Sequence, residues 1–197
     1  MSTKVITAAL VALALAAFAG TAVAAAPAGT PDPSAIALRA SDFPSGAKEA
    51  LAKKIAASGD LLAGYETSIV FAQPYGRSRF VIGLSSAYVE TSAASAAKAY
   101  GTLAHLYSSK VGQRAFVKAV TAKAAAKVAF AKPRSVGLPD SSMELAGTAV
   151  VKKSRTNFSI ELFRLDRVLV MDVMIGAGKT PVIADAKALT SIVAAKA

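Results

Sequence analysis

Two apolar segments near the C-terminus, within residues 157–175, carry the most regular pattern in the chain. Phe158, Ile160 and Leu162 alternate with polar residues, and this period of two is typical of a strand with one buried face. After a polar break at 164–167, residues 168–175 are β-branched and almost wholly apolar, which indicates a strand buried on both faces in the middle of a sheet. We therefore predict a hairpin here, and the rest of the chain must cover its two faces.

Asp172 is the one charged residue in the second of these strands. By alternation it shares a face with Val168, Val170 and Met174. An unpaired carboxylate in such a position is costly, so the pattern predicts a partner or a wet cleft beside it. Three interpretations stay open: a buried ion pair, local exposure of the strand, or a ligand-binding role.

Apolar spacing also predicts the remaining secondary structure. Ser45 is a plausible N-cap for the first helix, and Thr180 with Pro181 is a plausible start for the last one. The predicted elements, in order, are a helix at 46–57, strands at 65–71 and 79–90 joined by a type I turn at 73–76, helices at 92–107 and from 110 onward, a strand at 143–153, the hairpin and a final helix. The order helix-strand-strand-helix-helix-strand-strand-strand-helix places the chain in the α+β class, with a sheet of about five strands.

The N-terminal segment has a composition unlike the rest. Lys4 gives a short basic start, an apolar alanine-rich run follows, and Ala22-Val23-Ala24 fits a small-x-small cleavage site. We therefore predict a signal peptide at 1–26, a Pro-rich linker at 27–36 and a single domain at 37–197. This organisation predicts a secreted or periplasmic protein of a bacterium.

Residue content narrows the possible chemistry. The chain has no cysteine, which excludes disulfides, thiol catalysis, Cys-ligated zinc and iron–sulfur clusters. His105 is the only histidine and is expected to be exposed, so neither a Ser-His-Asp triad nor a histidine-rich metal site can be assembled. Gly178-Lys179-Thr180 ends like a phosphate-binding loop, but Val173 stands where that loop requires a glycine. We expect no cofactor and no metal. A carboxylate pair for glycoside hydrolysis stays open, since folding could bring two scattered acids together.

Charge is the strongest anomaly in the composition. Without residues 1–26, 22 basic and 12 acidic residues leave a net charge of +10. No acidic residue occurs between Glu90 and Asp140, and the eight basic residues there give this stretch a charge of +8. In an exported protein such a patch favours phospholipid head groups, anionic wall polymers or an acidic partner over nucleic acid. A solvated helix face explains the same pattern equally well.

Short motifs spread over the chain resemble a family of small exported domains of high-GC bacteria. Residues 38–46 (LRASDFPSG) resemble an L-x-x-x-D-L-P-x-G opening, and residues 80–100, 136–142 and 163–170 match further landmarks in order. The family includes secreted lipoproteins and proteins similar to the extracellular sensor domains of membrane serine/threonine kinases. The resemblance implies an antiparallel sheet with helices packed on it and a cleft. It brings no established ligand, and the disulfides of the kinase sensor domains are absent here.

These observations predict an exported, monomeric, non-enzymatic binding or sensor-like protein of the cell envelope. A cleft is expected to hold a small-molecule or lipid ligand, lined by Arg164 and Asp172 on the central hairpin. The alternative prediction is an envelope-associated protein that binds anionic polymer or lipid head groups through the basic region 98–134. Its anion-binding residues would be Lys110, Arg114, Lys118, Lys123 and Lys127.

Overall fold

A computed structural model describes residues 27–43, 46–121, 127–138, 141–151, 154–177 and 180–197. The predicted signal peptide at 1–26 therefore lies outside the described residues, as does Lys123. The described part is α+β. Its elements are α2 (Pro33–Ile36), the 3-10 turn η1 (Ala40–Asp42), β1 (Ala47–Ile55), β2 (Leu61–Tyr75), β3 (Phe80–Glu90), α3 (Ala93–Ser108), α4 (Lys110–Thr121), β4 (Lys127–Phe130), β5 (Ser141–Val151), β6 (Ser154–Leu165), β7 (Val168–Ala177) and α5 (Ile183–Ala194).

All strands of the described part join one antiparallel sheet, in the order β1-β2-β3-β7-β6-β5-β4. The predicted hairpin is confirmed as β6 and β7, with Phe158 opposite Ile175 and Leu165 opposite Val168. β7 lies in the middle of the sheet, between β3 and β6, and every residue from Val168 to Gly176 is buried. Burial on both faces explains why this strand lacks an alternating polar pattern.

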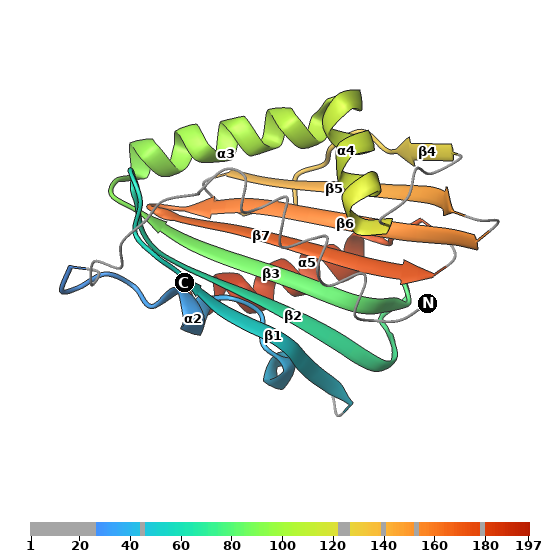
Figure 1. Ribbon diagram of the computed structural model, residues 1–197, viewed down its shortest axis with the longest axis horizontal. Helices are drawn as coiled ribbons and strands as arrows, with labels where there is room; N and C mark the ends of the chain where they lie inside the picture. Colours follow the sequence, from blue (N-terminus) through green and yellow to red (C-terminus); the bar gives the residue numbers. More distant parts are fainter. Residues whose placement is uncertain (1–26, 44–45, 122–126, 139–140, 152–153, 178–179) are drawn as a thin grey trace.

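Helices cover both faces of the sheet, and each face has its own core (Figure 1). On one face, Tyr107 of α3 and Phe116 and Val117 of α4 pack on Phe158, Ile160 and other strand residues. On the other, Ile36 of α2 and Leu189 and Val193 of α5 pack on apolar residues that include Phe163, Val170 and Met174. Alternation along the strands assigns neighbouring residues to opposite cores.

The prediction of a helix at 46–57 is wrong, because residues Ala47–Ile55 form the edge strand β1. Its half-buried residues are Ala47, Leu51 and Ile55, spaced by four as on a helix. A register shift between Glu49 and Leu51 interrupts the pairing with β2 and contributes to this spacing. Only one side of an edge strand is paired, so polar residues are tolerated on both faces and strand alternation is lost.

Other boundaries also differ from the predictions. The sheet has seven strands in the described part rather than about five, because β1 and the short β4 were not expected as strands. The turn between β2 and β3 occupies residues 76–79, since β2 continues through Tyr75. α5 begins after Val182, which provides no side-chain cap, so Thr180 is not its N-cap. Residues 27–36 are not simply a linker, because α2 belongs to them and Ile36 is buried in the core.

Candidate functional site

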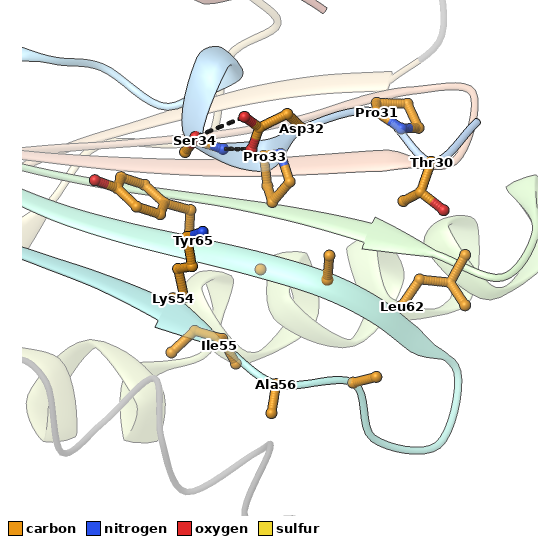
Figure 2. A pocket seen from close by; sticks show the side chains of 13 residues that line it. Thr30, Pro31, Asp32, Pro33, Ser34, Lys54, Ile55, Ala56, Leu62 and Tyr65 are labelled. Atoms are coloured by element: carbon orange, nitrogen blue, oxygen red, sulfur yellow. Dashed lines mark hydrogen bonds between the residues drawn. The ribbon is translucent and has the colours of Figure 1, made fainter. Parts of the chain in front are cut away.

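A pocket of about 430 Å³ lies where the N-terminal segment crosses the ends of β1 and β2 (Figure 2). The segment forms one wall and the two strands form the other. The lining is mainly apolar, with a few polar side chains at its edges. Its residues are Thr30, Pro31, Asp32, Pro33, Ser34, Lys54, Ile55, Ala56, Ala57, Leu62, Ala63, Gly64 and Tyr65.

The wall formed by the N-terminal segment is held in place by a helix cap. The Asp32 carboxylate accepts hydrogen bonds from the Ser34 amide at 2.9 Å and the Ser34 hydroxyl at 2.8 Å, and Pro33 occupies the first turn of α2. Figure 2 shows these bonds on the side of the pocket opposite Ile55 and Leu62. The next residues are anchored too, because the Leu38 amide donates to the Ser85 hydroxyl on β3.

The polar groups of the pocket differ in whether they have hydrogen-bond or ion-pair partners. The Ser34 hydrogen bonds, and to a smaller degree Lys54, lower the pKa of Asp32, so this carboxylate is ionised and already engaged. The Thr30 hydroxyl is buried without a hydrogen-bond partner among the described residues. Lys54 is exposed and forms no ion pair within the described part of the chain. The free hydrogen-bonding capacity of the pocket therefore comes from a hydroxyl and a cation, beside an apolar surface.

A second hollow, of about 450 Å³, lies on the other face between the β1–β2 connection and α3. Glu90 at the end of β3 lines it, together with Asp60, Lys98 and residues of the first turns of α3. Burial, and then the nearby Asp60, raise the pKa of Glu90. One carboxylate oxygen of Glu90 has no hydrogen-bond partner in the described structure. Ionisable side chains from the β1–β2 connection, β3 and α3 therefore line this hollow together.

Asp172 lies at one end of a buried row of acidic side chains, with Glu161 in the middle. Glu144 on β5 is opposite Glu161 on β6, and Glu161 is opposite Asp172 on β7. All three are fully buried. Arg134 donates to Glu144 at 3.0 and 2.8 Å, and the Ser159 hydroxyl lies 3.2 Å from Glu144 and 3.0 Å from Glu161. Only one of the three carboxylates thus has an ion-pair partner within the described residues.

The remaining two carboxylates are poorly satisfied. Among the described residues, no donor forms a hydrogen bond to either carboxylate oxygen of Asp172. One of the two oxygens of Glu161 also has no hydrogen-bond partner there. Burial raises the pKa of Asp172 from 3.8 to about 7, although the Ser85 hydroxyl and the Lys196 ammonium act in the opposite direction. Burial and the neighbouring Asp172 raise the pKa of Glu161 well above its ordinary value. A protonated carboxyl in this row removes most of the cost of burying it.

The two predicted lining residues are not brought together. Asp172 faces the α5 side, whereas Arg164 pairs with Leu169 and faces the α3 side, near the β6–β7 turn. The Arg164 guanidinium donates to the Asp166 carbonyl at 3.0 Å. Neither residue lines the pocket beside residues 30–34 or the hollow beside α3. A shared ligand contact for the pair stays a prediction without geometric support.

Three of the predicted anion-binding residues lie together on one helix, unlike Arg164 and Asp172. Lys110, Arg114 and Lys118 lie one helical turn apart on α4, and all three are exposed. Lys127 is exposed on β4. His105 is exposed on α3, as predicted.

Sequence reasoning missed the pocket of residues 30–34, 54–57 and 62–65. The available signal was Asp32-Pro33-Ser34, which is an N-cap followed by proline at the first helical position. The run of prolines around it favoured a linker instead. The strand half of the pocket carried no signal, because its alanines and leucine have no distinctive spacing.

The chain is similar in fold to a solved protein structure. No protein-family model and no curated protein matches the chain. Among solved structures, the extracellular domain of PknH from Mycobacterium tuberculosis superposes with a TM-score of 0.57 at 12% identity, covering 86% of this chain and 98% of that domain. The fold is thus similar to that of the extracellular domain of a mycobacterial serine/threonine kinase. The motifs behind the resemblance stay predictions.

No described helix has both the length and the apolar content that a membrane crossing requires. Among the same residues, no group of three or more His, Cys, Asp or Glu is arranged to hold a metal ion.

Proposed function

We propose that this protein is a non-enzymatic, sensor-like binding protein of the bacterial cell envelope, and that its ligand occupies the pocket between residues 30–34 and the ends of β1 and β2. The observation that carries the proposal is this pocket of about 430 Å³ on a fold similar to an extracellular domain. The apolar run and cleavage-like site within residues 1–26 support an exported location.

The lining of the pocket favours a small amphipathic ligand. Ile55, Ala56, Leu62 and Ala63 offer an apolar surface of the kind that buries most of a small molecule. Lys54 is a cation without an ion-pair partner in the described part, so it suits an acidic group on the ligand. The unpartnered hydroxyl of Thr30 suits a hydrogen bond to the same end.

Native mass spectrometry of the protein from its producing cells, without detergent, tests the proposal. The expected result is an additional mass that is lost when Ala56, on the pocket wall, is changed to tryptophan. Ala52→Trp is the matched control, because Ala52 is exposed on β1 and does not line the pocket. A bare polypeptide mass for the wild-type protein, or a ligand that survives Ala56→Trp, would overturn the proposal.

A second candidate function is binding of an anionic surface through the basic region 98–134. One observation favours it: α4 exposes three cations on consecutive turns, and the sequence places no acidic residue in α3 or α4. Such a stripe attracts phosphate or carboxylate groups, and the attraction weakens as salt screens it.

A further inference from the structure

The corner between α3 and α4 exposes the largest apolar side chains on the described surface. Val111 is 79% exposed and Leu106 is 42% exposed, and these are the two large hydrophobic residues that the described part leaves uncovered. They lie on either side of the short connection between the helices. In Figure 1 this corner is at the upper edge of the molecule, remote from β1 and β2. Two exposed apolar side chains at one corner make it a candidate interaction surface when a second feature supports it.

Hydrogen bonds and a close backbone approach fix the connection between the two helices. Ser109 caps the start of α4, because its hydroxyl accepts the Gly112 amide at 3.0 Å and donates to the Leu106 carbonyl at 2.8 Å. Gly112 packs directly against Leu106, and a Cβ at this position would overlap the Leu106 carbonyl oxygen. The helices therefore meet at a close contact that only glycine allows.

Cations flank this apolar tip on one side. Lys110, Arg114 and Lys118 lie on the same exposed face of α4 as Val111. None of the three forms an ion pair within the described residues, and α3 and α4 contain no acidic residue. The tip therefore combines uncovered apolar side chains with uncompensated positive charge.

We infer that the α3–α4 corner docks on the surface of an anionic phospholipid bilayer, with Val111 and Leu106 entering the interface and Lys110, Arg114 and Lys118 contacting the lipid phosphates. The inference deepens the second candidate function by naming its partner. An anionic polymer in water would engage the cations but would leave Val111 and Leu106 exposed. A bilayer interface satisfies both features at once, as in peripheral amphipathic helices.

The test uses protein expressed from Pro27, which retains every described element, with circular dichroism as the check on folding. Sedimentation with vesicles of equal parts phosphatidylglycerol and phosphatidylcholine measures binding. We expect binding at about 0.1 M salt, weaker binding at about 1 M, and little binding to phosphatidylcholine alone. Lys110→Gln is expected to weaken binding roughly fivefold, since one charge is removed from the surface contact.

Val111→Ser separates the bilayer from a polymer, because it removes apolar surface without changing the charge. It should strongly weaken vesicle binding while leaving binding to soluble polyglutamate nearly intact, because the polymer contacts only the cations. Ala184→Ser and Lys187→Gln are the matched controls, since both residues are exposed on α5 at the opposite face. Vesicle binding by Val111→Ser equal to that of the wild-type protein, or no vesicle binding by the wild type, would overturn the inference. The α4 variants should not change the ligand mass seen in native mass spectrometry, so failure of this inference and failure of the pocket proposal are distinguishable.

Discussion

β6 and β7 present their side chains alternately to the two faces of the sheet, and the faces differ in what they bury. Toward α3 and α4, Phe158, Ile160 and Leu162 of β6 meet an aromatic cluster that includes Phe116. Toward α5, the same strand buries Asn157, Ser159 and Glu161 before it reaches Phe163. Along β6 and β7, the side chains buried toward α3 and α4 are therefore apolar. Those buried toward α5 include polar and acidic groups, whose cost depends on their protonation.

This difference shows that burial alone does not define a uniform core. Asp172 and Val173 are neighbours with exposed fractions of 0% and 3%, yet the first is a poorly satisfied acid and the second packs among apolar side chains. We therefore expect the two faces to respond differently to mutation and to pH. The α3–α4 face should be sensitive to lost volume, and the α5 face should be sensitive to charge.

The largest expected effect is loss of an aromatic ring from the α3–α4 face. Phe158→Ala should reduce the free energy of unfolding by about 3 to 5 kcal/mol, because it leaves a cavity in a fully buried position. Phe163→Ala, on the opposite face of the same strand, is the matched comparison. It should cost about 1 kcal/mol less, since Phe158 also contacts the rings of Phe116 and Phe130 at 5.5 and 6.4 Å. Urea denaturation of both variants measures this, and a larger loss for Phe163→Ala would contradict the comparison.

The second expected effect is a pH dependence that originates on the α5 face. Burial raises the pKa of Asp172 from 3.8 to about 7 in the folded protein, so between about pH 4 and 7 the folded state keeps a proton that the unfolded state releases. Stability from this group is therefore greatest below about pH 4, falls as pH rises to about 7, and stays low above it. Glu161, whose pKa is also raised, acts in the same direction.

Asp172→Asn removes this titration. Above pH 7 the variant should be more stable than the wild-type protein, on the order of 2 to 4 kcal/mol, and the advantage should vanish near pH 4. Denaturation curves between pH 4 and 8 measure the slope. Asp166→Asn is the control at an exposed position and should leave the slope nearly unchanged. A wild-type protein whose stability increases from pH 4 to 7 more steeply than that of Asp172→Asn would contradict the assignment.

The α5 face also shows how far the sequence could predict the fold. Alternation placed Asp172 with Val168, Val170 and Met174, and the structure confirms that shared face. What the sequence could not reveal is the register between strands, which sets Glu161 beside Asp172 and Glu144 beside Glu161. That register depends on contacts between residues far apart in the chain, and no local pattern encodes it.

β1 shows a different limit of local patterns. Ala47-Lys48-Glu49-Ala50-Leu51-Ala52-Lys53-Lys54 consists of strong helix formers, and their propensity predicts a helix. Pairing with the long strand β2 overrides this preference, because the ladder pairs residues on both sides of the register shift between Glu49 and Leu51. The strand side of the candidate pocket depends on this same pairing. For that reason the site could not be predicted before the fold was known.

The smallest expected effect concerns how the helices on the two faces are held. α3 begins with a capping box, in which the Ser92 hydroxyl accepts the Ser95 amide at 3.1 Å and the Ser95 hydroxyl accepts the Ser92 amide at 3.1 Å. α5 begins at Ile183, after Val182, which provides no side-chain cap, and depends on the burial of residues such as Leu189. Ser92→Ala should therefore cost about 1 kcal/mol in thermal or urea denaturation, whereas Ser191→Ala on the exposed side of α5 should cost less than about 0.5 kcal/mol. Equal losses for the two variants would show that the cap does not distinguish the helices, and packing would then be the principal support of both.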